Sequence, residues 1–425
     1  MTGYRAIAPL ARPIDTMIRP PGSKSETIRA LLAAALATGR SRLERPLDSE
    51  DTDFARRALE QLGVEIESEQ ERWTVKGSAG VLRPAPGPID AGASGLTARA
   101  MIAVAALIDG NTTVVGRDRL PERPMGGLVQ ALRALGVEAV DTGGRLPVTV
   151  LGTGALPGGT VEVASDQTTQ FATALLMAAP LAEGPRHIVP TGLEGSHRYL
   201  DMTLETMHRF GARVDRTDRG YRGFPTGYTG SDLEIEPDAS AAVYPMVAAA
   251  ISGGRVTIDG LGAGSIQPDM AVAGVLAAMG CDLSQSDTAT TVDARGRRLQ
   301  PIDVDLSGSP DGSLAVAVAA LFAAGASRLR GLGSLRFKES DRLSALATEM
   351  TRLGAGARIE GTELVVTPAA MRPARIETYG DHRIAMSFAL VGLGAAGIEI
   401  ADPEVVAKTW PGFWDMLDCL SEPDP

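Results

Sequence analysis

The sequence contains few of the residues that build metal centres and disulfide frameworks. It has two cysteines, Cys281 and Cys419, and four histidines among 425 residues. The cysteines lack the paired spacing of a zinc or redox site, and the histidines are too scattered for a zinc cluster. Two thiols in a chain of this length are typical of a reducing compartment. We therefore expect no metal site and a cytoplasmic protein.

Long apolar runs and positive net charge are also lacking. The N-terminal residues Met1–Arg5 carry no apolar signal core, and no uninterrupted apolar run reaches the length of a membrane span. The net charge of −11 argues against nucleic acid or an anionic membrane as the main partner. A local basic cluster inside an acidic protein still attracts small anions. We expect small-molecule partners, with no nucleic acid and no membrane.

Aromatic residues are scarce at 4%, whereas glycine is abundant at 49 residues and recurs at a regular interval. Alanine-rich helical patterns end in glycine six times, with steps of 71, 74, 70, 71 and 72 residues between successive glycines, and a second series of helix ends repeats at similar steps. The first series is Gly39, Gly110, Gly184, Gly254, Gly325 and Gly397, and the second is Gly63, Gly136, Gly211, Gly280 and Gly354. Glycine often ends a helix, so one match would mean little. Two interleaved series predict six repeats of about 72 residues, each with two helices and several short strands.

Six repeats can form one ring or two lobes of three, and the length of the chain favours two lobes. If the N-terminal strand, residues 4–19, pairs with the C-terminal lobe, the two crossovers fall near residues 20 and 239. The loop Glu236–Asp238 is a plausible second hinge. We therefore predict a C-terminal lobe of residues 1–20 plus 239–425 and an N-terminal lobe of residues 21–238.

The stretch Pro20–Arg29 has the features of an anion site. Pro-Pro-Gly ends the preceding strand, and Ser23 or Ser25 can cap the apolar helical pattern that follows. The free backbone N–H groups at a helix N-terminus attract anions. Lys24 and Arg29 add two positive charges beside them. The alternative is an ordinary capped helix with solvated charges.

Further charged or hydroxyl-rich turns precede helical patterns in other repeats. They are Asp90–Arg99, Arg117–Pro124 (with Pro124 in the first helical turn), Ser165–Phe171, Leu335–Arg342, Thr378–Arg383 and Lys408–Pro411. Taken singly, the stretch Leu335–Arg342 is equally consistent with an exposed, salt-bridged helix start. His382 is better placed to titrate than a typical lone histidine. If these turns face one cleft, that cleft is strongly positive and suits two polyanionic substrates.

In this order, the motifs resemble the 5-enolpyruvylshikimate-3-phosphate synthase (3-phosphoshikimate 1-carboxyvinyltransferase) family over essentially the whole chain. The matching motifs are Pro21–Ser25, Glu122–Pro124, Gln170–Phe171, Ser334–Arg342, Asp381–Arg383 and Lys408–Thr409. The resemblance implies an α/β (α+β) fold of two similar lobes, each of three βαβαββ repeats, the inside-out α/β barrel of the enolpyruvyl transferases. It also implies an active site in the cleft between the lobes, which close like a clamp.

The resemblance implies a reaction as well. The carboxyvinyl group of phosphoenolpyruvate is transferred to the 5-hydroxyl of shikimate 3-phosphate by addition and elimination, which releases phosphate. This is a step of the shikimate pathway to chorismate and the aromatic amino acids. The family needs neither metal nor organic cofactor, and we expect a monomer whose partners are these two substrates.

Site residues follow from the same resemblance. Those expected to bind shikimate 3-phosphate are Lys24, Ser25, Arg29, Thr168, Thr169, Gln170, Ser196, Tyr199, Asp311, Ser334 and Lys338. Those expected to bind phosphoenolpyruvate are Lys24, Gly95, Arg123, Gln170, Arg342, Arg383 and Lys408. The expected catalytic residues are Lys24, Asp311, Glu339 and His382, with Asp311 or a deprotonated Lys24 as the base and Glu339 as the acid.

The sequence also departs from the family pattern. Ala93–Leu96 replaces the usual Asn-Ala-Gly-Thr, which removes an amide and a hydroxyl near the phosphoenolpyruvate site. Thr168–Gln170 replaces Ser-Ser-Gln and keeps the hydroxyls, and Ser334 stands where an asparagine is common. We expect the chemistry to be retained, while affinity for phosphoenolpyruvate and for mimics such as glyphosate stays open.

Three alternatives remain at this point. UDP-N-acetylglucosamine enolpyruvyl transferases carry a cysteine in the first lobe and an Asn-Lys-Asn motif, and this chain has neither. A diverged transferase acting on another cyclic alcohol is supported only by Ala93 and Leu96. A non-catalytic binder of phosphorylated metabolites would be weakened by the carboxylates of Asp311 and Glu339.

Overall fold

The computed structural model describes residues 3–192 and 197–421. The chain divides into two compact units. Unit 1 contains Met1–Pro21 and Pro237–Pro425, and unit 2 contains Gly22–Glu236. The expected lobe boundaries lie within two residues of these divisions.

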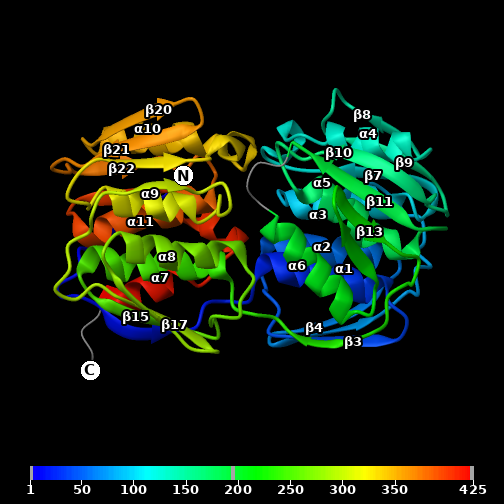
Figure 1. Ribbon diagram of the computed structural model, residues 1–425, viewed down its shortest axis with the longest axis horizontal. Coiled ribbons are helices and arrows are strands. Elements are labelled where there is room, and N and C mark those ends of the chain that lie inside the picture. The colour runs from blue at the N-terminus through cyan, green and yellow to red at the C-terminus, as the bar shows by residue number, and fades with distance from the viewer. Residues whose placement is uncertain (1–2, 193–196, 422–425) are drawn as a thin grey trace. The chain divides into compact units, whose positions relative to one another are not determined.

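Unit 2 is built around three helices that are buried along most of their length. Their alanine- and leucine-rich sequences leave little to present to solvent, and in α3 every residue is buried. They are α1 (Lys24–Leu36), α3 (Gly95–Ala105) and α5 (Gln170–Ala178). Each is followed by a helix with one polar face: α2 (Glu50–Gln61), α4 (Gly126–Ala134) and α6 (Arg198–Arg209). The sheets lie outside these helices (Figure 1).

Three four-stranded sheets surround the helices of unit 2, with strand orders β14-β3-β5-β4, β6-β7-β9-β8 and β10-β11-β13-β12. The first two strands of each sheet are parallel and the remaining pairs are antiparallel. The strands are β3 (Arg40–Glu44), β4 (Glu65–Glu69), β5 (Arg72–Lys76), β6 (Ile89–Asp90), β7 (Asp109–Val115), β8 (Glu138–Asp141), β9 (Val148–Thr153), β10 (Gly159–Ala164), β11 (Arg186–Thr191), β12 (Val214–Thr217), β13 (Gly220–Gly223) and β14 (Asp232–Glu234). The second and third repeats thus read βαβαββ along the chain, whereas the first borrows its parallel strand, β14, from the end of the unit.

Unit 1 repeats the arrangement. Its buried helices are α7 (Ala239–Ser252), α9 (Ser313–Ala320) and α11 (His382–Gly394), and the helices that follow them are α8 (Ala271–Ala278), α10 (Arg342–Arg352) and α12 (Phe413–Ser421). Its sheets have the orders β16-β17-β15-β2, β18-β19-β21-β20 and β1-β23-β22. The strands from the C-terminal part of the chain are β15 (Arg255–Asp259), β16 (Asp282–Gln285), β17 (Ala289–Asp293), β18 (Asp303–Asp305), β19 (Ser327–Arg330), β20 (Gly356–Glu360), β21 (Glu363–Thr367), β22 (Ala374–Ile376) and β23 (Ile398–Ala401).

The N-terminal segment supplies two strands to unit 1 rather than the single strand expected over residues 4–19. Strand β1 (Tyr4–Ile7) pairs antiparallel with β23, and β2 (Asp15–Ile18) pairs parallel with β15. The segment between them holds Pro13 and turns from one sheet to the next. The N-terminal residues thus complete two different repeats of unit 1.

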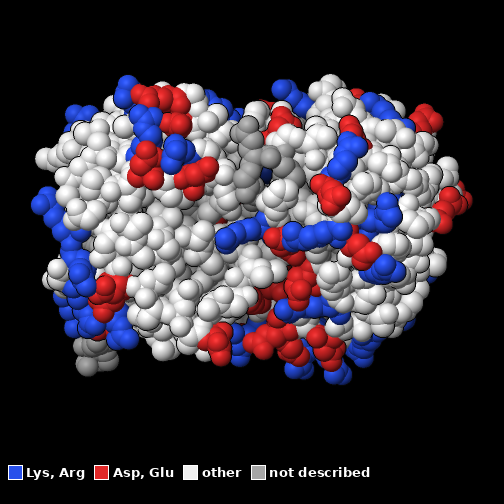
Figure 2. Space-filling view, viewed as in Figure 1, with Lys and Arg blue, Asp and Glu red and all other residues white. Residues whose placement is uncertain are grey.

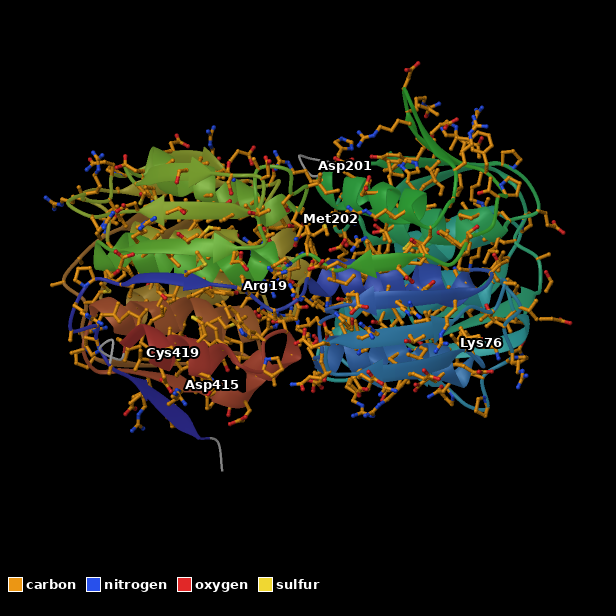
Figure 3. The ribbon with its side chains drawn as sticks, turned by 90° about the horizontal axis from the view of Figure 1, so that it is seen from below. Arg19, Lys76, Asp201, Met202, Asp415 and Cys419 are labelled. Carbon is orange, nitrogen blue, oxygen red and sulfur yellow. The ribbon has the colours of Figure 1, made fainter. Side chains whose placement is uncertain are left out.

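The surface carries charges of both signs. Lys and Arg side chains lie among Asp and Glu side chains on the face in Figure 2, in keeping with exposed ion pairs such as Arg330–Asp303 and Lys76–Glu65. Of the two cysteines, which form no disulfide, Cys281 is buried and Cys419 is exposed on α12 (Figure 3). Among the described residues, no helix combines the length and apolar character that crossing a membrane requires.

Candidate functional site

The N-terminus of α1 holds Lys24 beside a carboxylate. Ser23 caps this helix, and its side chain accepts a hydrogen bond from the backbone N–H of Glu26. The Nζ of Lys24 lies 3.1 Å from Oδ2 of Asp51, a buried residue in the first turn of α2. Sequence reasoning missed Asp51, because an acidic residue in a first turn usually only complements the helix dipole.

Arg29 is buried and held on several sides, so its charge is not a solvated one. Its guanidinium donates to Oγ1 of Thr203 at 2.9 Å, to the Tyr199 carbonyl at 3.3 Å and to the Ser25 carbonyl at 2.9 Å. Burial lowers the pKa of Arg29 to about 10. Ser25, Arg29 and Tyr199 are therefore brought together. Ser196 lies outside the described residues.

A second cluster in unit 2 gathers Gly95, Arg123 and Gln170 around Arg99. Nη1 of Arg99 donates to Oε1 of Gln170 at 2.5 Å, and Nη2 donates to the Pro124 carbonyl at 2.9 Å. A Cβ on Gly95 would lie 2.8 Å from Nη1 of Arg99 and 2.9 Å from Cζ of Arg123. Glycine at this position therefore allows two arginines to lie against the start of α3.

The structure adds details at the starts of α4 and α5, and the one at α4 differs from the prediction. Helix α4 begins at Gly126, so Pro124 precedes it instead of lying in its first turn. The backbone N–H groups of Met125 and Gly126 both donate to the Gly144 carbonyl, which supplies a partner for two N–H groups at the start of α4. Thr169 is the N-cap of α5, and the Oγ1 of Thr168 accepts from the backbone N–H of Gln170 at 3.2 Å.

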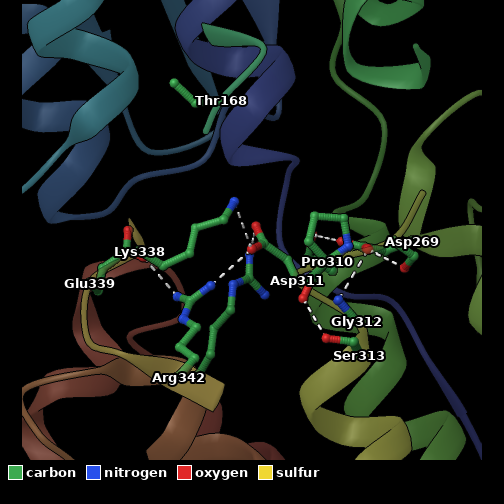
Figure 4. Close-up of polar contacts among 12 residues, drawn as sticks. Thr168, Asp269, Pro310, Asp311, Gly312, Ser313, Lys338, Glu339 and Arg342 are labelled. Carbon is green, nitrogen blue, oxygen red and sulfur yellow. Dashed lines mark hydrogen bonds and ion pairs between the residues drawn. The ribbon is translucent and has the colours of Figure 1, made fainter. Parts of the chain in front are cut away.

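In unit 1, Arg342 is surrounded by three carboxylates, of which Asp311 and Glu339 are labelled in Figure 4. Its side chain is only 1% exposed. Its nitrogens lie 2.9 Å from Oδ1 of Asp311, 2.8 Å from Oε2 of Glu339 and 2.8 Å from Oδ2 of Asp381. Burial alone would lower the pKa of Arg342, but the three negative charges raise it above its usual range, so the guanidinium stays charged.

Asp311 is in turn surrounded by positive charge. Its carboxylate contacts Arg342, lies 3.5 Å from Nζ of Lys338, and lies 3.2 Å from Nη2 of Arg383. Although burial favours the protonated form, Arg383, Lys338 and Arg342 hold the pKa of Asp311 well below its usual range. The carboxyl group is therefore ionised.

The loop that carries Asp311 is fixed by Asp269, which sequence reasoning missed. The Oδ1 of Asp269 accepts from Oγ of Ser309 at 2.5 Å and from the backbone N–H of Gly312 at 3.1 Å (Figure 4). Its other oxygen accepts from Ser240. Burial, and then the charge of Asp311, raise the pKa of Asp269. Nothing local in the sequence marks this residue, since Ser309 lies forty positions away.

The remaining predicted residues of unit 1 lie around the same cluster. Glu339 contacts Arg342 and lies 3.7 Å from Nζ of Lys408. His382, the first residue of α11, has no exposed surface, and its Nδ1 lies 3.7 Å from Oδ1 of Asp381. Ser334 lies on the short 3-10 helix η4 (Gly333–Phe337) that leads to Lys338. Unit 1 thus brings together Asp311, Lys338, Glu339, Arg342, Arg383 and Lys408.

The arrangement can bind anions and move protons. Buried arginine forks match the geometry of carboxylates and phosphates. The carboxylates of Asp311 and Glu339 supply groups for proton transfer next to these cations. Within residues 3–192 and 197–421, no group of three or more His, Cys, Asp or Glu side chains is arranged to hold a metal ion.

Comparison with known proteins decides the family. Residues 10–417 match the family described as EPSP synthase (3-phosphoshikimate 1-carboxyvinyltransferase). The chain belongs to the EPSP synthase family. A 3-phosphoshikimate 1-carboxyvinyltransferase of Methanoculleus marisnigri is 40% identical over 413 residues, which cover 95% of this chain and 96% of that protein. One from Pseudoalteromonas translucida is 38% identical over 425 residues, covering 98% of this chain and 99% of the relative.

A solved structure supports the same conclusion for the EPSP synthase fold. An EPSP synthase from Acinetobacter baumannii matches with a TM-score of 0.82 and 25% sequence identity, over 99% of this chain and 98% of that one. The predicted fold class, with six repeats in two similar sets of three, is confirmed.

Leu96 is one of the residues that depart from the EPSP synthase pattern, and it is buried. Its side chain is 6% exposed and belongs to the hydrophobic core of unit 2. Ser94 caps α3 by accepting from the backbone N–H and the hydroxyl of Thr97. Both cysteines lie in unit 1, which leaves unit 2 without the cysteine of the UDP-N-acetylglucosamine enolpyruvyl transferases.

Proposed function

We propose that the chain transfers the carboxyvinyl group of phosphoenolpyruvate to the 5-hydroxyl of shikimate 3-phosphate and releases phosphate, as a step of the shikimate pathway. The observation that carries the proposal is the cluster around Asp311. An ionised carboxylate lies among Lys338, Arg342 and Arg383, so a proton acceptor is held next to groups that bind anions.

Shikimate 3-phosphate binds mainly to the residues of unit 2 in this proposal. Lys24, Ser25 and the hydroxyls of Thr168 and Thr169 supply donors for its phosphate, and Arg29 fixes Ser25 and Tyr199 through their carbonyls. We assign Gln170, Ser196 and Tyr199 to the binding of the ring, and Asp311, Ser334 and Lys338 of unit 1 complete the set.

Phosphoenolpyruvate binds to Arg342, Arg383 and Lys408 of unit 1 in this proposal. Two arginine forks and an ammonium group suit its carboxylate and phosphate. Lys24, Gly95, Arg123 and Gln170 of unit 2 complete the set. The backbone at Gly95 lies so close to Arg123 that an added methyl group would not fit without a shift of this side chain.

Asp311 acts as the base that removes the proton of the 5-hydroxyl. In the free protein three cations depress its pKa, which makes it a weak base. The carboxylate and phosphate of the donor neutralise Arg342 and Arg383, which raises the proton affinity of Asp311 when both substrates are bound. Lys24 remains the alternative base.

Glu339 acts as the acid that protonates the methylene carbon of the donor. Glu339 contacts Arg342 and Lys408, whose positive charges favour the ionised carboxylate. The negative charge of the incoming phosphate opposes this effect and favours the protonated form that an acid needs. The cations stabilise the negative charges of the tetrahedral intermediate. His382 has no exposed surface, so we assign it a supporting role at the start of α11.

Phosphate release tests this proposal. The purified protein is incubated with phosphoenolpyruvate and shikimate 3-phosphate, with shikimate as the control acceptor. We expect release that requires both substrates and falls by about 10²–10⁴-fold in Asp311→Asn. Asp303→Asn, which removes an exposed carboxylate of the same unit, serves as the matched control.

Each other outcome has a meaning. No release by the wild type, with shikimate 3-phosphate still bound tightly, would favour a diverged transferase with another donor or acceptor. Turnover that survives in Asp311→Asn would remove Asp311 from the role of base. Shikimate 3-phosphate bound equally or more tightly by Asp311→Asn, with no turnover in either protein, would favour a non-catalytic binder.

The proposal includes a monomeric, cytoplasmic protein. Each unit has its own hydrophobic core within one chain, so folding requires no second copy. The two cysteines form no disulfide, as is usual in a reducing compartment. Light scattering on the purified protein and cell fractionation test the two statements, and a stable dimer or an exported protein would contradict them.

A further inference from the structure

Glu349 is a buried carboxylate that has no role in the proposed reaction. It lies on α10 and has no exposed surface. Its oxygens accept from the Tyr379 hydroxyl at 2.7 Å, from Nε of Arg352 at 2.8 Å and from the backbone N–H of Glu377 at 3.3 Å. Because a buried carboxylate needs its hydrogen bonds, these partners are held tightly in place.

Two of the partners come from the loop before α11, and this loop is strained. Tyr379 has φ of +56°, a left-handed conformation that costs free energy for a residue with a side chain, and Gly380 follows with φ of +65°. The two residues turn the chain into Asp381, which caps α11 through the backbone N–H of Arg383. The bond from the Tyr379 hydroxyl to Glu349 offsets the strain at Tyr379.

Helix α10 therefore holds the loop at two points. Arg342, at its start, contacts Asp381, and Glu349 lies seven residues later, about two turns along the same side of the helix. The loop is fixed between Arg342 and Glu349. Since Asp381 caps the helix that carries Arg383, the position of both arginines depends on this double attachment.

We propose that Glu349, acting through Tyr379 and Glu377, is a positioning residue that aligns Arg342 and Arg383 to bind the carboxylate or phosphate of the donor substrate. The inference rests on the proposed function, since it concerns the anion site assigned to these arginines. It predicts a defect in donor affinity, and none in the binding of shikimate 3-phosphate to unit 2.

The test removes one hydroxyl. Tyr379→Phe keeps the ring and the backbone strain but loses the bond to Glu349. Glu349→Gln keeps the size of the side chain but leaves one acceptor oxygen for the three donors. We expect KM for phosphoenolpyruvate to rise about tenfold in each, with kcat and the affinity for shikimate 3-phosphate little changed. The matched control is Thr351→Ala, which removes an exposed hydroxyl of the same helix, bonded to the Ala347 carbonyl, and leaves Glu349 with all three of its partners. It should change KM less than twofold.

A second measurement does not depend on activity. Hydrogen exchange of the amides of Asp381–Ile384 should accelerate in Tyr379→Phe and not in Thr351→Ala, because the loop loses its attachment only in the former. If the wild type shows no turnover but this exchange difference is found, the proposed function fails and the positioning role stands. If the wild type turns over while Tyr379→Phe changes neither KM nor exchange, the positioning role is wrong. An equal fall of kcat and thermal stability in all three variants would also contradict it, since it would show only structural damage.

Discussion

The guanidinium of Arg342 donates to both carboxylate oxygens of Asp381, at 2.8 and 3.2 Å, and neither side chain is more than 1% exposed. Asp381 also accepts from Oγ of Ser340 at 2.9 Å. A buried pair of this kind costs much to desolvate, and breaking it removes one of the three carboxylates that surround Arg342.

Asp381→Asn should therefore be destabilising. We expect a loss of about 1.5–3 kcal/mol from the unfolding free energy, since Arg342 loses a charged hydrogen-bond partner but keeps Asp311 and Glu339. KM for phosphoenolpyruvate should rise as well. Thermal unfolding and steady-state kinetics measure the two effects. Asp303→Asn, at an exposed pair with Arg330, should change neither, and an unchanged Tm in Asp381→Asn would contradict the prediction.

Gly95→Ala should weaken the donor site. Its Cβ would lie 2.9 Å from Cζ of Arg123, so this side chain or that of Arg99 must move. We expect KM for phosphoenolpyruvate to rise by about tenfold or more, with kcat less affected. The matched control is Gly274→Ala in α8, where the added methyl group meets open space. That variant should gain about 1 kcal/mol of stability from helix propensity and keep its KM.

Glu26 should make stability depend on pH. Burial raises its pKa to about 7 from an ordinary value of 4.5, and its Oε2 accepts from the backbone N–H of Glu236 at 2.8 Å. A raised carboxyl pKa favours folding at low pH, and this contribution is lost as pH rises from about 4.5 through about 7. Glu26→Gln stays neutral throughout.

We therefore expect Glu26→Gln to match the wild type near pH 4 and to exceed its stability by about 3 kcal/mol at pH 8. Denaturation at the two pH values measures the difference. Glu205→Gln, on the exposed face of α6, should show no such divergence. A Glu26→Gln variant that is less stable than the wild type at pH 8 would contradict the raised pKa of Glu26.

Arg186 should be replaceable with a gain in stability. It is fully buried at the start of β11, burial lowers its pKa to about 10, and in the described part of the chain its Nε and Nη1 have no hydrogen-bond partner. Arg186→Met removes this uncompensated charge and keeps much of the volume. We expect a gain of about 1–3 kcal/mol, read from chemical denaturation. Arg222→Met, on an exposed position of the neighbouring strand β13, should stay within about 0.5 kcal/mol of the wild type. Loss of stability in Arg186→Met would show that the guanidinium is better compensated than its contacts indicate.

The repeat architecture could be predicted because it depends on local backbone chemistry. All five glycines of the second series, from Gly63 to Gly354, adopt positive φ at helix ends, where a side chain would be strained. The borrowed strands could not be predicted in this way. Strand β14 completes a sheet with β3, nearly 190 positions earlier, and no local pattern encodes such a pairing.

The site residues also divide into those that a local motif marks and those that depend on distant partners. Lys24, Arg342 and Asp311 lie in contiguous motifs, so the sequence could mark them as candidates. Asp51, Asp269 and Glu349 each act on a partner between 27 and 40 residues away, and an isolated acidic residue has no signature of its own. The roles assigned to the candidates stay predictions until the variants are measured.

The pairing of β1 with β23 also has a consequence for synthesis. Tyr4 faces Ala401 and Ile7 faces Ile398, so β1 is synthesised long before the strand with which it pairs. Unit 2, by contrast, is one uninterrupted segment whose ends meet, because the N–H of Ser23 donates to the Glu236 carbonyl at 2.7 Å. The segment in the middle of the chain can thus fold on the nascent polypeptide, while the earlier N-terminal residues remain without a sheet. In such a chain the order of folding differs from the order of translation, and the waiting N-terminal strands are the part most exposed to premature association.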